Sequence, residues 1–216
     1  MDTNDAVHGE FTMCDIDENG LWTPGKTHKN KLMVSWGYAA CKTLGQGDGR
    51  YRINVMYIEF HENPGDLLSS VSSDPYTKFD GNGYYKVDLA GKSNQDYLRV
   101  ELDGQPNIEV APGYEPFFGA ASGNQDQITG NRLHFTARTP SDATAKGIHG
   151  TSFGTNSIIY GVALVASPIL RPPVSTGENT QDVLISRGYF EAASQRKVTS
   201  GIQVGVTWDL TFPPAD

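Results

Sequence analysis

Near its end the chain carries the feature that most constrains its fold, an unbroken alternation of apolar and polar residues from Gly201 to Phe212. Alternation at period two predicts a β-strand with one face on a core and the other in water. Pro213 and Pro214 end this strand, because proline donates no backbone hydrogen bond to a neighbouring strand. The residues expected to face the core are Ile202, Val204, Val206, Trp208, Leu210 and Phe212.

Further strand patterns recur between residues 51 and 190. The segment 51–60 has two mostly apolar faces and is expected to be a central strand, and 157–165 is expected to be covered on both faces. With 24 glycines and 12 prolines to make turns, 216 residues in this pattern predict an all-β domain. A β-sandwich with jelly-roll topology is the expected architecture. The remaining predicted strands are 84–89, 96–102, 132–138 and 182–190.

The first 45 residues are predicted to differ from the rest. Residues 1–28 hold turn formers with little periodicity, and are expected to form an N-terminal arm outside a single sandwich domain, 29–216. Residues 29–45 are predicted to form one amphipathic helix, because Leu32, Met33 and Trp36 begin an apolar pattern at helical spacing and Gly45 can close the last turn.

Three long loops are predicted, at 103–131, 139–155 and 167–180. Loops of that length in a compact domain usually bind something or form an interaction arm. The first two contain aromatic residues that could stack on a sugar or cover a subunit interface, and the interface is the preferred interpretation because aromatics are enriched there. These interface candidates are Tyr114, Phe117, Phe118 and Phe153.

No residue pattern predicts a metal or cofactor site. Residues 15–20 imitate the start of a calcium loop, but its twelfth position holds Lys26 where a bidentate glutamate is needed, so an Asx-type turn is preferred. Glu59, His61 and Glu62 could ligate a metal at the end of one strand, but lack a second histidine motif and are interpreted as a solvated strand end.

No catalytic pattern is visible either, so we expect no enzyme activity. His149 and Ser152 share a loop without an evident acid partner, and no Gly-x-Ser-x-Gly turn is present. The net charge of −8 argues against broad binding to nucleic acid or anionic membranes. Cys14 and Cys41 form no redox motif, and neither a signal peptide nor an apolar run long enough to span a membrane is expected.

Three segments resemble virion structural proteins of tailed bacteriophages. The segment 181–212, QDVLISRGYFEAASQRKVTSGIQVGVTWDLTF, is similar to the closing segment of many such proteins. The segment SIIYGVALVASP, which starts at Ser157, resembles their penultimate strand, and KNKLMVSWGYAACKTLGQGDGRYRINVMYIEF, which starts at Lys29, resembles their opening. The segment between them, 61–156, is not covered by the resemblance.

The resemblance implies a structural role in a phage particle assembled in the host cytoplasm. It implies a capsid decoration or cement protein that binds the major capsid protein, or a tail or fibre-attachment protein. We expect a homo-oligomer, and we expect a trimer because three jelly rolls around a threefold axis leave their tip loops free to contact a shell. The alternative, from a different class, is a β-sandwich module that binds carbohydrate or a receptor through its aromatic loops.

Overall fold

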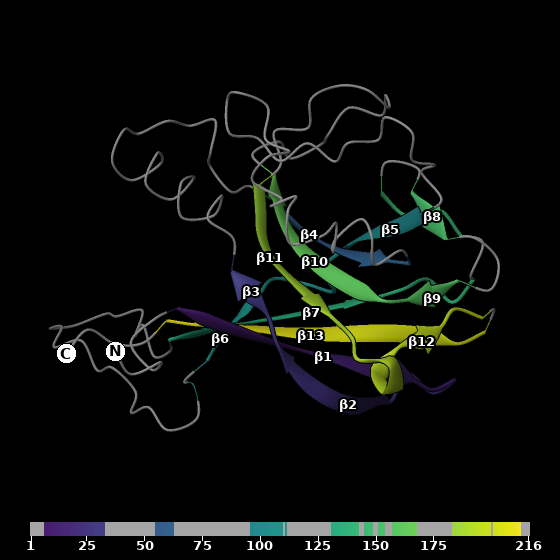
Figure 1. Cartoon of the computed structure of the whole chain (residues 1–216), viewed down its shortest axis with the longest axis horizontal. Helices are drawn as coiled ribbons and strands as arrows, with labels where there is room; N and C mark the ends of the chain where they lie inside the picture. The colour runs from purple at the N-terminus through teal and green to yellow at the C-terminus, as the bar shows by residue number, and fades with distance from the viewer. Residues whose placement is uncertain are drawn as a thin grey trace, which may run out of the picture.

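The computed structural model describes residues 7–32, 55–62, 96–109, 111, 131–142, 145–148, 151–153, 157–167, 183–199 and 201–212. Within these ranges the chain forms two large antiparallel β-sheets and a short two-stranded pair (Figure 1). The prediction of an all-β chain is therefore confirmed. In this part of the chain no helix has the length and apolar character needed to cross a bilayer.

The first sheet has five strands and joins the two ends of the described chain. Its strand order is β2 (Trp22–Lys29), β1 (His8–Ile16), β13 (Gln203–Thr211), β7 (Arg132–Arg138) and β6 (Asn107–Glu109). The first and last strands pair directly, with His8 opposite Thr211 and Ile16 opposite Gln203. β13 therefore lies in the middle of the sheet, between β1 and β7.

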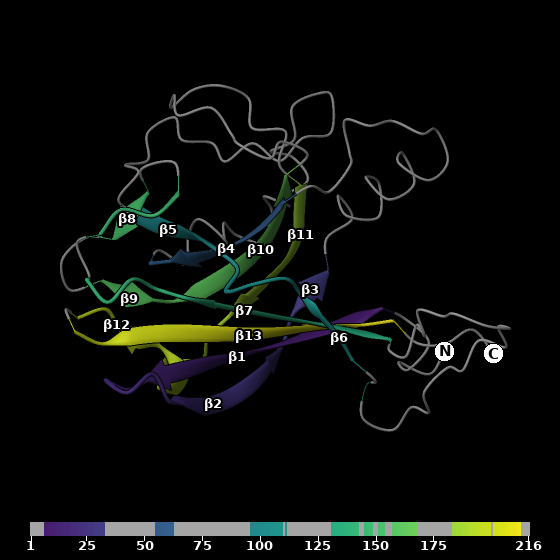
Figure 2. The ribbon, with the colours of Figure 1, turned by 180° about the vertical axis from the view of Figure 1, so that it is seen from behind.

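The second sheet has six strands. Its order is β3 (Lys31–Leu32), β11 (Val183–Tyr189), β10 (Gly161–Ser167), β4 (Val55–His61), β5 (Asp96–Glu101) and β8 (Ser152–Phe153). β4 is a central strand, paired with β10 on one side and β5 on the other. A short pair, β9 (Ile158–Ile159) with β12 (Arg196–Lys197), lies at one end of the two sheets (Figure 2), and one 3-10 turn, η4, spans Ala192–Ser194.

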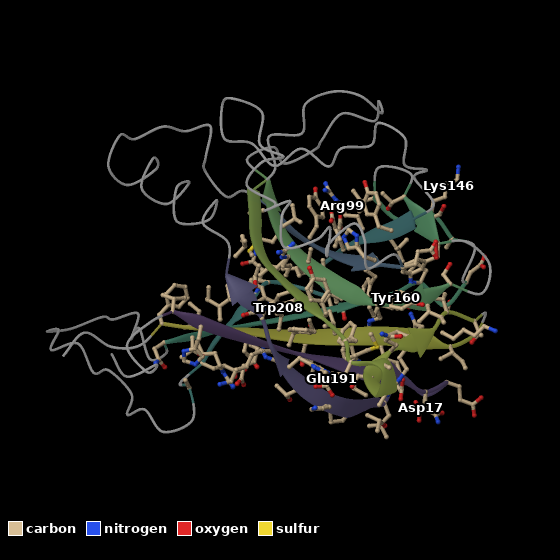
Figure 3. All side chains as sticks on the ribbon, in the orientation of Figure 1. Asp17, Arg99, Lys146, Tyr160, Glu191 and Trp208 are labelled. Atoms are coloured by element: carbon tan, nitrogen blue, oxygen red, sulfur yellow. The ribbon has the colours of Figure 1, made fainter. Side chains whose placement is uncertain are left out.

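One hydrophobic core receives alternate residues from both sheets. The ring of Phe11 in β1 lies 5.2 Å from the ring of Trp208 in its own sheet and 5.2 Å from that of Phe190, which follows β11 of the other sheet. A Cβ added to Gly188 in β11 would meet the Phe11 ring, so the two sheets approach each other as closely as a glycine allows. Figure 3 shows Trp208 between the two sheets.

The burial of β13 follows its alternation. Its inward residues Val204, Val206, Trp208 and Leu210 are at most 3% exposed. Phe212 is half-buried and packs against the core. Ile202 differs from the expectation, since it precedes the strand and is 52% exposed.

The N-terminal prediction needs correction. Residues 8–29 are not an arm outside the domain, because they form β1 and β2, and Phe11 and Met13 are buried in the core. The predicted helix 29–45 is also wrong at its start, since Lys29 ends β2 and Lys31–Leu32 form β3, which pairs with β11. Backbone pairing with these neighbouring strands decides the local structure here against the weak helical pattern. Residues 33–45 lie outside the described residues.

The long segments predicted as loops contain short strands where they are described. β6 lies within 103–131, and β8 lies within 139–155. The segments 84–89 and 168–180 lie outside the described residues.

Candidate functional site

An open groove lies on the outer face of the five-stranded sheet, the face turned away from the core. Its volume is about 540 Å³, and its lining brings together the four strands β2, β1, β13 and β7 and the segment after β5. The residues that line it include Cys14, Trp22, Asp103, Thr136, Arg138 and Thr207. The volume lies within the usual range for small-molecule sites, roughly 300–1,000 Å³.

Trp22 forms one wall of this groove, and a glycine makes its position possible. A Cβ added to Gly205 would lie 2.3 Å from Cζ3 of the Trp22 indole. The half-buried indole therefore rests directly on the backbone of β13, where any larger residue would displace it. The Arg138 guanidinium carbon lies 5.5 Å from the centre of the indole ring, within the range of a cation–π contact.

Arg138 and Asp103 form an ion pair at the edge of the groove. Arg138 Nε donates to Asp103 Oδ2 at 3.0 Å, and the two side chains are 41% and 21% exposed. Among the described residues, the two Nη groups of Arg138 and Oδ1 of Asp103 have no hydrogen-bond partner. These donors and this acceptor are available to a ligand.

A second depression continues from the first. It has a volume of about 390 Å³ and shares Asp103 and Arg138 with the groove beside Trp22. Its lining also includes Glu101, Lys146 and Gln203. Gln203 Nε2 donates to the carbonyl oxygen of Thr139 at 2.8 Å, which holds this side chain at the rim. The two depressions together form one elongated groove, which begins on the outer face of the five-stranded sheet and continues to β5 of the six-stranded sheet.

The outer face of the five-stranded sheet is polar around the groove, and Thr136 and Thr207 of this face line the groove itself. The strand register places four threonines, one from each of four adjacent strands, in one row across the sheet. The hydroxyls of Thr12 and Thr27 in this row are 2.8 Å apart. In the next row His134 Nδ1 lies 2.7 Å from Asp209 Oδ1. The row of four consists of Thr27, Thr12, Thr207 and Thr136.

A second concentration of charged residues lies on the six-stranded sheet and is buried. Glu59 in β4 and Arg99 in β5 lie opposite each other in the strand register, and Arg99 Nε and Nη2 donate to Glu59 Oε1 at 2.9 and 2.5 Å. His61 Nε2 lies 3.0 Å from Glu59 Oε2. The side chains of these three residues are at most 5% exposed. Figure 3 shows Arg99 on the side of its sheet opposite to Trp208.

Two aromatic rings pack around this charge cluster. The Arg99 guanidinium lies 5.3 Å from the centre of the Tyr57 ring, and the His61 ring stacks on that of Tyr97 at 5.4 Å with 14° between the planes. His61 Nδ1 is buried and has no hydrogen-bond partner among the described residues. The cluster therefore joins β4 to β5 by charge and by aromatic contact.

The buried cluster holds Glu59 ionised. Burial alone would raise the pKa of this carboxyl, but the charge of Arg99 and the hydrogen bond and charge of His61 outweigh it and lower the pKa to about 2. A carboxylate with that pKa does not release or take up a proton near neutral pH. The arrangement suits a permanent ion pair between strands better than acid–base chemistry.

The structure corrects the interpretation of Glu59 and His61 as a solvated strand end, because both side chains are buried. It supports the interpretation of residues 15–20 as an Asx-type turn: Asp17 Oδ1 accepts from the backbone N–H of Asn19 at 2.9 Å and of Leu21 at 2.8 Å. Asp15 Oδ1 accepts from Arg196 Nε at 2.7 Å. In the described part of the chain, no three His, Cys, Asp or Glu residues gather as metal ligands would.

Of the four aromatic residues predicted to lie at an interface, the structure describes one, Phe153. Phe153 is 7% exposed and belongs to the hydrophobic core, so it offers no surface to a partner and that proposal is corrected. Tyr114, Phe117 and Phe118 lie outside the described residues, as does His149.

The sequence pattern predicts no role for four of these residues, Trp22, Arg138, Asp103 and Arg99. One signal pointed to the groove: Gly205 interrupts the polar face of a long strand, and a glycine there often marks the close approach of another group. Its partner Trp22 lies in a segment assigned to an arm, so the two were not connected.

Comparisons of the chain with protein-family models, with curated proteins and with solved structures give no match.

Proposed function

We propose that this chain is a structural component of a tailed-bacteriophage particle, a capsid cement or decoration protein that binds neighbouring major capsid subunits. The observation that supports this best is the position of the segments that resemble phage proteins. They contain β10 and β13, which are interior strands of the two different sheets and are paired on both sides. The resemblance thus concerns the strands that form the framework of the fold. It does not identify a binding or catalytic site.

The arrangement of strands supports a jelly-roll-like sandwich as the finer description of the fold. The first strand pairs with the last, and neighbours such as β13 and β7 or β10 and β4 are far apart in sequence, so the chain crosses between the sheets. Both sheets contribute to one core. These are features of double-sheet folds with Greek-key connections.

Ion pairs between separate segments support a role that needs rigidity. Arg99 pairs with Glu59 across β5 and β4, and Arg132 with Glu109 across β7 and β6. Arg196 pairs with Asp15, which joins β12 to β1. Such pairs fix strand neighbours and register, which is useful in a protein that must hold its shape within a shell.

The proposed particle role makes the chain a homo-oligomer of the virion, assembled in the host cytoplasm, and the proposed form is a trimer whose tip loops face the shell. Tail or fibre attachment is the variant of this role in which the partner is a tail protein. A carbohydrate-binding or receptor-binding module is the alternative from another class, and the groove beside Trp22 is the observation that favours it.

Two sedimentation measurements test the proposal. The isolated chain is first sedimented to find its mass in solution, where a trimer is expected. It is then mixed with empty heads that lack it, and the heads are pelleted. Saturable pelleting with the heads supports a cement protein, and pelleting with tails alone supports the attachment role. A monomer that pellets with neither would overturn the virion proposal.

A further inference from the structure

We propose that the elongated groove, which runs from the outer face of the five-stranded sheet to β5, binds a neutral oligosaccharide, with Trp22 as the stacking surface and the Arg138–Asp103 pair as the polar centre. This inference does not depend on the virion proposal, because it is tested on the isolated chain and the virion proposal is tested on particles. Three properties of the groove support this ligand: its shape, its aromatic wall and its charge.

The shape favours an extended ligand. Two depressions of about 540 and about 390 Å³ meet at Asp103 and Arg138, so a ligand can pass from one to the other along the same pair of side chains. A compact ligand would fill one depression and leave the other to water. A chain of two or three sugar rings would contact both, with the ion pair near its middle.

The aromatic wall favours a ligand with flat apolar faces and polar edges. Trp22 is held by the backbone of β13 at Gly205 and does not need to be ordered on binding, which reduces the entropy cost of association. An indole combines a broad apolar face with an N–H, a pairing that suits amphipathic ligands. The axial C–H groups of a pyranose ring make such an apolar face, and its hydroxyls make the polar edge.

The polar groups match hydroxyls. The free Nη donors of Arg138 and the free Oδ1 of Asp103 can bind a pair of neighbouring hydroxyls, one accepting and one donating. Thr136 and Thr207 line the groove beside Trp22, and their hydroxyls can donate or accept hydrogen bonds. This mixture of donors and acceptors is what a polyhydroxylated ligand requires.

The charge of the groove argues against a polyanion. The charged residues of its lining are three cations, Arg99, Arg138 and Lys146, and two anions, Asp103 and Glu101. The charge of Arg99 is balanced by the buried carboxylate of Glu59, and the other four charges cancel. The whole chain carries a net charge of −8. Nucleic acids and sulfated glycans are bound mainly by an excess of Lys and Arg, so an uncharged oligosaccharide is the better match.

The test titrates the isotope-labelled chain with neutral trisaccharides of glucose, galactose, mannose and N-acetylglucosamine, while the indole N–H signals are followed by NMR. We expect at least one trisaccharide to shift the Trp22 signal in a saturable way. The variant Trp22→Ala should weaken its binding about tenfold or more, the loss expected for an aromatic contact of about 1.5 kcal/mol. Leu21→Ala is the matched control, because Leu21 is the 66% exposed neighbour of Trp22 and its loss should leave binding unchanged.

Two further variants keep the test decisive. Gly205→Ala places a methyl group where the indole lies and should weaken binding while every polar side chain is retained. Asp103 lies in an exposed segment, so the variant Asp103→Asn should fold. It should weaken binding, and it can be measured even if Trp22→Ala fails to fold. The proposal is overturned if no trisaccharide binds at millimolar concentration, if Asp103→Asn and folded Trp22→Ala bind as the parent does, or if only a heparin fragment or a DNA oligonucleotide binds.

Discussion

At the scale of single residues, the contact of Glu59 with Arg99 and His61 is a deeply buried cluster of ionisable side chains, each at most 5% exposed. Two ions this deeply buried carry a large desolvation cost, which their attraction offsets only when the geometry is good. The bond lengths of 2.5 to 3.0 Å within the cluster meet that condition. Removing Glu59 therefore takes a carboxylate away from a buried guanidinium, and this loss is costly.

We expect the free energy of unfolding to fall at acid pH because of Glu59. Its pKa in the folded chain is about 2, below the ordinary value of about 4.3 for a glutamate in an unfolded chain. The unfolded state therefore takes up a proton first as the pH falls, and the stability due to Glu59, complete above about pH 5, is lost toward pH 2. Urea unfolding between pH 7 and pH 2 measures this loss as a falling free energy of unfolding.

The variant Glu59→Gln assigns the loss to this residue. It should cost on the order of 3–5 kcal/mol at pH 7, because the buried Arg99 guanidinium then loses the carboxylate that it contacts at 2.5 and 2.9 Å, and the free energy of unfolding of this variant should vary less with pH below 5. Glu191→Gln is the control, since its pair with Lys26 is 60% and 63% exposed and should add little to stability. Parallel pH curves for the parent and Glu59→Gln would contradict the assignment.

A second expectation at residue scale concerns Asp15 and Asp17. Their side-chain oxygens accept from Arg196 and from two backbone N–H groups of the turn, so a calcium ion would have to replace these bonds. We expect millimolar calcium to leave the melting temperature unchanged, because a ligand that binds only the native state must raise it. A rise of several degrees that Asp17→Asn abolishes would show that the turn binds calcium.

At the scale of elements, β13 is the strand on which the five-stranded sheet depends. Trp208 is fully buried there, and Trp208→Ala should cost on the order of 3–5 kcal/mol through the cavity it leaves. Ile202→Ala is a matched control from the same alternating segment, where 52% exposure should limit the change to about 0.5 kcal/mol. If urea unfolding gave the same loss of free energy of unfolding for Trp208→Ala and Ile202→Ala, burial would not determine the cost of a substitution in this segment.

The contact between the two sheets can be tested at Gly188. A Cβ there would lie 1.9 Å from Cε1 of Phe11, so Gly188→Ala should destabilise the chain by about 1–3 kcal/mol through overpacking. Adding Phe11→Leu to Gly188→Ala should recover part of the loss by making room, although Phe11→Leu alone is destabilising. Independent, additive losses in thermal unfolding would mean that the two residues do not meet.

Element prediction from the sequence succeeded where alternation is strong and failed where pairing decides. The segments that became β4, β7, β10 and β13 carry dense apolar patterns, and their strands were expected. β2 contains Pro24 and Gly25 and few apolar residues, and it is a strand because it pairs along β1 with a register shift between Thr12 and Cys14. Proline is tolerated there because β2 is an edge strand.

The same limit applies to the site. Gly205 was visible in the sequence as a gap in a strand, but Trp22 reaches it only because β1 brings β2 beside β13. Arg99 meets Glu59 through the register of β4 and β5, which the pattern of either strand alone does not contain. Residues that share a strand face could be predicted, whereas partners across strands could not.

At the scale of the whole molecule, the two sheets have different outer surfaces. The five-stranded sheet exposes a polar face with an open groove, and the six-stranded sheet carries a buried charge cluster on the face opposite the core. We propose that the virion role and the glycan groove use different parts of this molecule. A decoration protein that stays bound to its shell while one sheet face meets a host surface would have use for both.

The measurement that tests the virion proposal most directly is electron cryo-microscopy of phage particles purified from a host that expresses the complete phage. We expect density for this two-sheet fold in many symmetry-related copies, in contact with major capsid subunits at a local threefold axis. Particles prepared without the chain should lack that density and lose their contents at lower temperature. Complete, stable particles with no density for this fold on head, tail or fibre would contradict the proposal.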